Sequence, residues 1–131
     1  MAELTRKIAL LGMGTVGSGV YNIIEKQKEE MPFKVGAELE IVKVLVRNKA
    51  KYAEVVPAEK LTDNFDDIIG DDSIDMVVEV MGGIEPARTY IKAALEKGKH
   101  VVTANKDLMA THGHELLDIA GQHHCDLLFE A

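Results

Sequence analysis

Short apolar runs alternate with longer amphipathic segments along this chain. Four runs rich in Val, Ile and Leu have the length of strands: residues 7–12, 39–46, 75–83 and 100–104. Between the first two runs, residues 15–30 carry apolar side chains at helical spacing. We expect the buried face of that helix to hold Val16, Val20, Ile23 and Ile24.

A second helix is predicted over residues 85–99. Pro86 fits its first turn, Gly98 suits the position just past its end, and its apolar stripe consists of Ala87, Tyr90, Ile91, Ala94 and Leu95. A third helical segment follows residue 104, interrupted near Gly113 and ending near His123. A final strand covers residues 126–131.

The remaining segments are connections. Pro32 and Gly36 mark a loop, and residues 59–72 form a polar connection with a short strand and a short helix. The alternation of strands and helices predicts an α/β domain with a parallel sheet and helices on both faces. The length of 131 residues suits one domain, and we assign residues 1–131 to it.

A glycine pattern stands between the first strand and the first helix. Gly12, Gly14 and Gly17 have the order G-x-G-x-x-G. Gly12 permits a tight turn, Gly14 lets the backbone approach a pyrophosphate, and Gly17 lets the helix pack on the strand. The pattern predicts a doubly wound, Rossmann-type dinucleotide-binding domain, and Met13, Thr15 and Val16 join the cofactor-binding set. The alternative is a glycine-rich turn that binds nothing.

The end of the second strand bears on the choice of dinucleotide. An NAD site places Asp or Glu there for the ribose 2′-hydroxyl, whereas this chain has Arg47, followed by Lys49 and Lys51, with no carboxylate before Glu54. Arg47 can meet a 2′-phosphate, so we expect NADP and allow NAD. The alternative is a solvated basic loop.

Two further groups follow strand ends, where doubly wound sheets bind ligands. Gly82 and Gly83 let the backbone pass close to a nicotinamide ribose; a plain turn is the alternative. Lys106, after Ala104 and Asn105, would point into the same crevice. There a lysine can hold a substrate oxygen, or move a proton if burial lowers its pKa. Position alone favours a functional Lys106 and an ordinary exposed surface lysine equally.

The overall composition excludes several classes of protein. The net charge is −7, which disfavours nucleic acid as a partner, and no apolar run reaches the roughly 20 residues of a membrane span. We read no signal peptide, and a lone Cys125 fits a reducing cytoplasm. The run His123–Asp126 lacks metal-ligand spacing. Glu79 lies within an apolar strand, for which we favour a structural role.

Three stretches carry a resemblance to a known family. "LLGMGTVGSGV", "DMVVEVMGGIEPARTYIKAALEKGKHVVTANKDLMATHGHEL" and "LLFEA" together resemble homoserine dehydrogenase across essentially the whole chain. Glu79 to Gly113 is the most specific part, because related sugar and semialdehyde oxidoreductases share the glycine pattern but not "GGIEPAR" with "TANKDLMA". Members interconvert L-homoserine and L-aspartate 4-semialdehyde with a nicotinamide cofactor, in threonine, methionine and isoleucine synthesis.

The resemblance assigns roles to particular residues. It gives Lys106 a part in substrate binding or proton transfer, and Thr103, Ala104 and Asn105 the nicotinamide side. It places Glu130 at a monovalent cation site whose other ligands lie beyond this sequence. The family continues into a substrate-binding and dimerisation domain, so we expect this chain to bind dinucleotide, to turn over little substrate alone, and to belong to a homo-oligomer when full-length. A dinucleotide-sensing module and another semialdehyde or sugar oxidoreductase are the alternatives.

Overall fold

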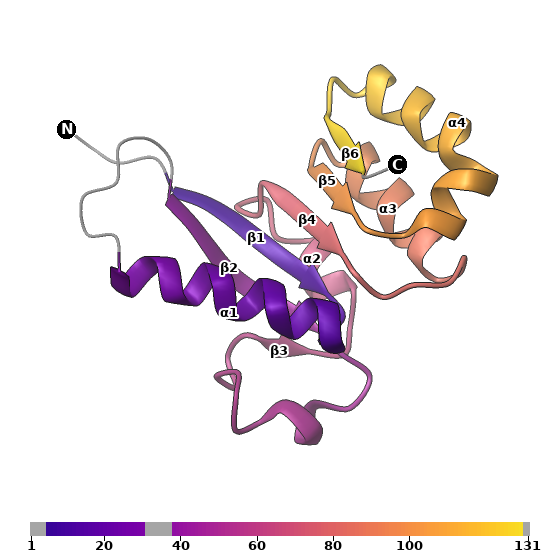
Figure 1. Ribbon diagram of the computed structural model, residues 1–131. Helices are drawn as coiled ribbons and strands as arrows, with labels where there is room; N and C mark the ends of the chain where they lie inside the picture. Colours follow the sequence, from indigo (N-terminus) through magenta and orange to yellow (C-terminus); the bar gives the residue numbers. More distant parts are fainter. Residues whose placement is uncertain (1–4, 31–37, 130–131) are drawn as a thin grey trace.

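The fold is built around one parallel sheet. The computed structural model describes residues 5–30 and 38–129. Its strands lie in the order β3-β2-β1-β4-β5-β6, and every neighbouring pair is parallel (Figure 1). Their bounds are β1 Thr5–Leu11, β2 Glu38–Leu45, β3 Leu61–Thr62, β4 Met76–Glu79, β5 His100–Thr103 and β6 Leu127–Phe129. The order reverses between β1 and β4, as in a doubly wound sheet.

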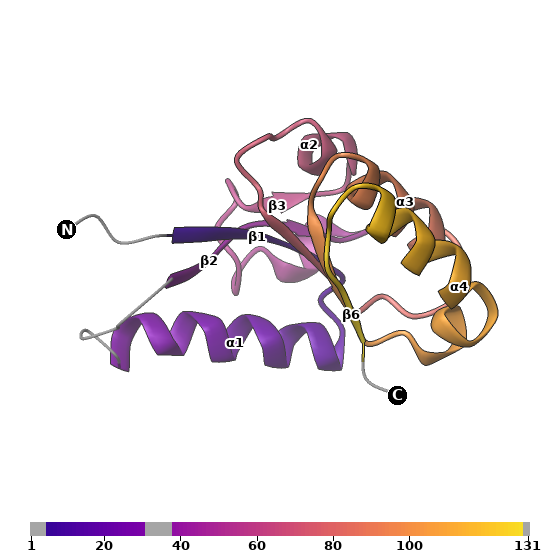
Figure 2. The same ribbon diagram turned by 90° about the horizontal axis from the view of Figure 1, so that it is seen from above.

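Helices cover both faces of the sheet. Figure 2 shows α1 on one side and α2 and α3 on the other. The described helices are α1 Thr15–Glu30, α2 Asp66–Ile69, α3 Ala87–Glu96 and α4 Lys106–Gln122, with a short 3-10 helix, η1, at Lys49–Tyr52. The predicted α/β Rossmann-type architecture is therefore confirmed, including the short strand and helix within residues 59–72.

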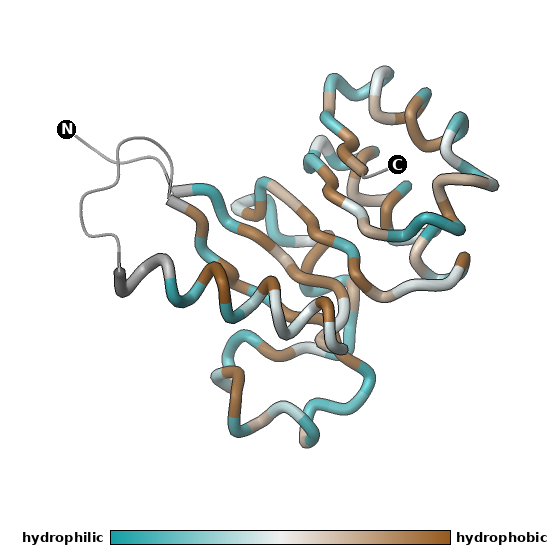
Figure 3. The backbone as a smooth tube through the Cα atoms, in the orientation of Figure 1, coloured by the Kyte–Doolittle hydropathy of each residue, from teal (hydrophilic) through white to brown (hydrophobic). Residues whose placement is uncertain are grey.

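Alternate residues of the strands feed two separate cores. Ala9 and Leu11 pack with α2, α3 and α4, whereas Ile8 and Leu10 pack with α1. Figure 3 shows hydrophobic stretches along the strands and a mainly hydrophilic connection around η1. This period of two is what a strand buried on both faces requires.

One half of the α1 side of the sheet is open. A row of paired residues runs across it from β2 to β6: Val44, Leu10, Val78, Val102 and Leu128. The first two are fully buried, the next two are half-buried, and Leu128 is 59% exposed. The main strand contacts of α1 are with β1 and β2, and the surface opens progressively beyond β1.

The predicted inner face of α1 is partly wrong. Ile24 is buried and Val20 half-buried, but Val16 is 56% and Ile23 61% exposed. The helix instead turns Gly17, Tyr21 and Ile24 toward the sheet. Both stripes have helical spacing, and the close approach of Gly17 to β1 selects between them.

The other helices differ from expectation in smaller ways. α3 buries four residues of the predicted stripe, Ala87, Ile91, Ala94 and Leu95, whereas Tyr90 is half-buried. Gly98 takes the expected position after the end of the helix with φ +77°. Pro86 precedes the first helical residue of α3 rather than lying in its first turn, and the Glu85–Pro86 peptide bond is cis.

The predicted interruption near Gly113 is wrong, because α4 continues through it. A glycine inside a helix costs only about 1 kcal/mol relative to alanine, which the packing of Leu108, Leu116 and Ala120 outweighs. The predicted loop at Pro32 and Gly36 lies outside the described residues. Within the described ranges, no helix is long and apolar enough to cross a membrane.

Candidate functional site

The glycine turn joins β1 to α1 at the carboxyl edge of the sheet. Gly12 has φ +104°, a conformation that side chains disfavour, and its N–H donates to the Leu45 carbonyl at 2.9 Å. A Cβ on Gly17 would overlap the Gly12 carbonyl oxygen and carbon. These two glycines thus hold the start of α1 against the end of β1, as their positions in the pattern predicted.

Gly14 meets a different requirement. A Cβ added there would find no atom within 4 Å, so the fold itself does not need a glycine at this position. Gly14 stands just before Thr15, where α1 begins, and the first turn of a helix leaves backbone N–H groups without helical partners. Together with the helix dipole, these groups attract an anion brought close to the backbone.

A crevice of about 710 Å³ opens in front of this turn. We call it the carboxyl-end crevice, because its walls follow the ends of β1, β2, β3 and β4. Five predicted cofactor-binding residues line it: Gly12, Met13, Gly14, Arg47 and Gly82. The volume lies in the usual range of pockets for small organic ligands.

The wall of the crevice beyond β2 is basic. Arg47 is exposed and lies beside Asn48, and Lys51 stands 5.5 Å from the centre of the Tyr52 ring. Asp63 after β3 also lines the crevice, so an acidic group shares this end with the two cations.

Some lining residues were not predicted from the sequence. These are Tyr52, Asp63, Glu85 and Tyr90, together with Lys51, noted only as part of the basic loop. Asp63 and Glu85 come shortly after the ends of β3 and β4, and this position could have identified them as crevice residues from the sequence. Tyr90 lies one turn into α3, where its ring stacks on Phe65 with centroids 4.0 Å apart. A stacking partner so distant in sequence leaves no local signal.

The ends of β4 and β5 are joined through buried polar groups. Glu79 is completely buried and accepts hydrogen bonds from the N–H groups of Met81 (2.8 Å) and Gly82 (3.1 Å) and from the Thr103 hydroxyl (2.5 Å). This bears out the structural role favoured for Glu79. Gly82 and Gly83 both have positive φ, +78° and +75°, which suits a sharp turn built from glycine.

The segment after β5 leads into α4. Asn105 caps α4, since its side-chain oxygen accepts from the Leu108 N–H at 3.1 Å. The Thr103 and Asn105 side chains are buried, whereas Ala104 and Lys106 are exposed. Of the remaining predicted residues, Thr15, Val16 and Gly17 form the first turn of α1, and Gly83 follows the lining residue Gly82. Glu130 lies outside the described residues.

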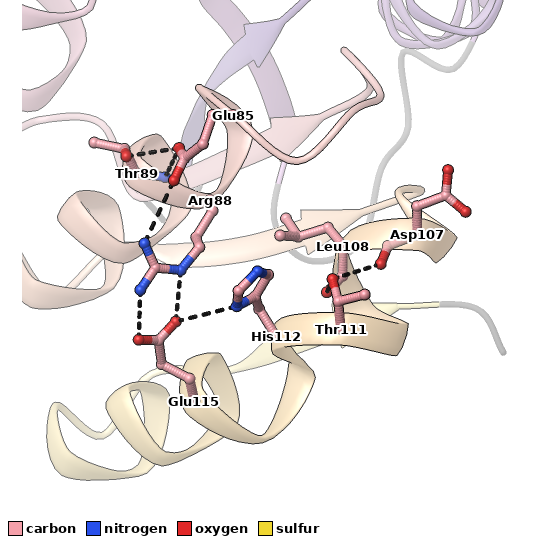
Figure 4. Close-up of polar contacts among 8 residues, drawn as sticks. All are labelled: Glu85, Arg88, Thr89, Asp107, Leu108, Thr111, His112 and Glu115. Atoms are coloured by element: carbon pink, nitrogen blue, oxygen red, sulfur yellow. Dashed lines mark hydrogen bonds and ion pairs between the residues drawn. The ribbon is translucent and has the colours of Figure 1, made fainter.

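A charged cluster connects α3 with α4 beside the crevice (Figure 4). Arg88 donates to both carboxylate oxygens of Glu115, at 2.7 and 2.6 Å, and contacts Glu85 at 3.4 Å. Hydrogen bonds from Arg88 hold the pKa of Glu115 below its ordinary value and raise the pKa of Arg88. The Thr89 hydroxyl donates to Glu85 and is the main cause that lowers the pKa of Glu85.

Two other groups considered from the sequence have ordinary surroundings. Cys125 is half-buried, and burial raises the pKa of its thiol, which makes it less reactive. Across residues 5–30 and 38–129, no three His, Cys, Asp or Glu side chains come together as metal ligands.

Comparison with known proteins gives consistent results. The family model described as "Homoserine dehydrogenase, NAD binding domain" matches residues 12–130. Homoserine dehydrogenase of Bacillus subtilis is 48% identical over 126 residues, which are 95% of this chain and 29% of that protein. The crystal structure of a homoserine dehydrogenase from Thiobacillus denitrificans matches with a TM-score of 0.88 and 39% identity, over 98% of this chain and 30% of that one. A Staphylococcus aureus homoserine dehydrogenase matches with a TM-score of 0.86 and 44% identity, over 98% of this chain and 32% of that one.

Proposed function

Because this chain belongs to the homoserine dehydrogenase family, as its NAD-binding domain, we propose that its carboxyl-end crevice binds the nicotinamide dinucleotide of a longer enzyme. That enzyme interconverts L-homoserine and L-aspartate 4-semialdehyde. The chain spans about 30% of the length of the relatives it matches. In this proposal the substrate-binding and dimerisation domain is the part that this chain does not include.

The observation that carries the proposal is the open space at Gly14. Its backbone stands at the start of α1 and lines the crevice, with no atom within 4 Å of where a Cβ would lie. A pyrophosphate can therefore reach the unpaired N–H groups of Thr15, Val16 and Gly17. Met13 packs below the turn, being only 5% exposed, and gives it a firm base.

Arg47 supports a preference for NADP. It is exposed at the end of β2, lines the crevice, and can reach a phosphate on the 2′ position of the ribose. A guanidinium binds phosphate through two parallel hydrogen bonds, which adds both affinity and geometric selectivity. The Asp63 carboxylate on the same wall can accept a hydrogen bond from a ribose hydroxyl. NAD is therefore the second cofactor to test.

Lys106 is the residue we propose for substrate handling. As the first residue of α4 it follows Asn105, whose side chain donates to the Gly83 carbonyl, although Lys106 itself does not line the carboxyl-end crevice. Its ammonium group can donate hydrogen bonds to the substrate oxygen and favour the charge that forms there. When bound, the nicotinamide ring accepts or delivers the hydride. Ala104, Thr103 and Asn105 form the adjacent backbone of the nicotinamide side.

Lys106 is exposed in this chain. In this proposal the substrate and the remainder of the longer enzyme cover it. Lys106→Ala in that enzyme would abolish turnover while leaving dinucleotide affinity nearly unchanged, whereas a dinucleotide-sensing module would be unaffected in both respects.

The finer assignments form part of the same proposal. The longer enzyme would be a homo-oligomer of the cytoplasm, serve threonine, methionine and isoleucine synthesis, and use Glu130 as one ligand of a monovalent cation. Potassium dependence of turnover in the longer enzyme, compared with a Glu130→Gln variant, tests the cation assignment.

The direct test of the proposal is a calorimetric titration of the 131-residue chain with NADPH and NADH. Gly14→Ala should weaken binding by tenfold or more, since about 1.4 kcal/mol of steric conflict suffices, while leaving the fold unchanged. Gly19→Ala is the matched control, because a Cβ at that position in α1 also meets no atom within 4 Å. Equal binding by both variants would contradict the pyrophosphate site.

A further inference from the structure

Buried and partly buried hydrogen bonds form a closed ring across the ends of β4 and β5. The Glu79 carboxylate accepts from Met81 N–H, Gly82 N–H and the Thr103 hydroxyl. The Thr103 oxygen accepts from the Asn105 N–H at 3.0 Å, and the Asn105 side-chain amide donates to the Gly83 carbonyl at 2.5 Å. The ring therefore returns to the glycine loop in which it began.

We propose that Glu79 is a positioning residue, which fixes the Met81–Gly83 loop relative to the first turn of α4. This inference rests on the proposed function, since it concerns the same crevice. Met81 and Gly82 line the crevice, and Lys106 directly follows the capping residue Asn105. The ring thus holds the crevice-lining loop and the backbone at the start of α4 in one fixed arrangement.

The burial of the Glu79 carboxylate supports this positioning role. A fully buried ionised group costs several kcal/mol unless hydrogen bonds compensate it. Glu79 is 0% exposed, and its three donors come from the loop and from β5. An apolar side chain in this strand would satisfy the packing without that cost, but it would leave the two loop N–H groups without these bonds.

The conformation of the loop also depends on these hydrogen bonds. Gly82 and Gly83 both have positive φ, a conformation that glycine also leaves readily. Within the described ranges, Glu79 is the hydrogen-bond acceptor for the Met81 and Gly82 N–H groups, and Asn105 binds the Gly83 carbonyl. A loop ordered in advance does not lose conformational entropy when the ligand binds, so the ring should increase affinity.

Glu79 and Thr103 also belong to adjacent strands. Glu79 and Thr103 are register partners in the pairing of β4 with β5, which are neighbours in Figure 1. A shift of either strand end would break the 2.5 Å bond and would move Asn105, and with it the start of α4.

The test compares two threonines that have the same local structure. Thr103→Val removes the hydroxyl that links Glu79 to Asn105. Thr62 is the matched control: it also ends a strand, is 3% exposed, donates to Asp67 at 2.6 Å and accepts from the Asn64 N–H at 3.1 Å. Both substitutions should lower the stability of the fold, but only Thr103→Val breaks the ring, whereas Thr62→Val can disturb the crevice only through its neighbour Asp63.

The measurement is NADPH affinity of the 131-residue chain by calorimetry, at a temperature where thermal unfolding shows every variant to be fully folded. We expect Thr103→Val to weaken binding by roughly tenfold, the size of effect of one hydrogen bond to a charged group, and Thr62→Val to weaken it much less. Glu79→Gln should keep near-normal binding, because an amide can accept from the loop N–H groups and donate to Thr103, whereas Glu79→Leu can do neither and should bind more weakly.

The outcomes separate this inference from the proposed function. If the unsubstituted chain binds NADPH and both threonine variants bind equally well or equally poorly, the positioning role is overturned and the dinucleotide site stands. If Glu79→Gln, which keeps hydrogen-bonding groups, binds NADPH as weakly as Glu79→Leu, which has none, the hydrogen bonds of the ring do not set the affinity. The inference is then again overturned. If the unsubstituted chain binds neither dinucleotide, the proposed function fails and the positioning role fails with it.

Discussion

Three glycines of one motif have three separate physical roles. Gly12 supplies a backbone conformation, Gly17 supplies close contact, and Gly14 leaves open space at the crevice. Only the first two stabilise the folded chain itself. At this scale substitutions can distinguish residues needed for folding from residues needed for binding.

The contact made by Gly17 leads to a stability prediction. Gly17→Ala forces a Cβ against the Gly12 carbonyl, so unfolding free energy should fall by about 1–3 kcal/mol, as for other overpacked sites. Gly19→Ala, two positions later in an open part of α1, should instead raise it by roughly 0.5–1 kcal/mol. Urea unfolding of both variants is the measurement, and a stable Gly17→Ala protein would contradict the packing argument.

Arg47 gives a prediction about cofactor selectivity. Arg47→Ala should weaken NADPH binding by about 10- to 100-fold, the range for hydrogen bonds to a charged group, and leave NADH binding nearly unchanged. Lys49→Ala removes the same charge from the same exposed loop, but Lys49 does not line the crevice. Calorimetric titration should show little effect of this control; equal losses for both variants would indicate only a general attraction of the basic loop for phosphate.

At the scale of elements, α3 and α4 are joined by more than apolar packing. The forked guanidinium of Arg88 matches the Glu115 carboxylate, and Glu85 links the same guanidinium to the crevice wall (Figure 4). His112 lies 3.9 Å from Glu115 on the same helix. Because α4 continues through Gly113, His112 and Glu115 lie one turn apart on the same face of that helix.

This cluster predicts a pH dependence of stability. The pKa of Glu115 is lower in the folded chain than its ordinary value, so the folded state binds fewer protons than the unfolded state in acid. The stabilisation is complete above the ordinary glutamate pKa and is lost as the pH falls through the folded pKa. The unfolding free energy of the original chain should therefore exceed that of Arg88→Gln at pH 7, and the difference should shrink as pH falls from about 5 to 2.

Urea unfolding at several pH values measures this difference. Thr89→Val serves as the comparison, because the Thr89 hydroxyl lowers the pKa of Glu85 without contacting Glu115. A difference between the original chain and Arg88→Gln that stays constant down to pH 2 would mean that the ion pair does not contribute through Glu115.

At the scale of the molecule, the sheet is covered unevenly. The α2, α3 and α4 side is closed, whereas the opposite side opens from Val78 through Val102 to Leu128. Exposed apolar surface of this kind favours association. β6 is also an edge strand of the described sheet, with Leu128 and Phe129 exposed.

The open half predicts self-association of the 131-residue chain as its concentration rises. Leu128→Ser should weaken that association by roughly tenfold, because burying one leucine contributes about 1.5–3 kcal/mol. Val55 is similarly exposed, at 64%, but belongs to the loop after η1, so Val55→Ser should have little effect. Sedimentation velocity over a range of concentrations makes the comparison; a chain that stays monomeric throughout would disprove the prediction.

The sequence by itself determined the local features of this protein. The spacing of apolar residues located the strands and α3. Gly12 and Gly98, which have positive φ, marked a turn and a helix end. Such features depend on residues close together in the chain, and so the pattern of the sequence contains them. The strand–turn–helix context of the glycines carried the prediction of a dinucleotide site for the same reason.

Tertiary structure alone decided the remaining features. Contact between Gly17 and Gly12 selected the inner stripe of α1, and core packing carried α4 through Gly113. The bond between Glu79 and Thr103 joins residues 24 positions apart. Such partners meet only when β4 and β5 pair, because strand pairing sets which distant side chains face each other. The same pairing places Leu128 at the open end of a row that begins buried at Val44.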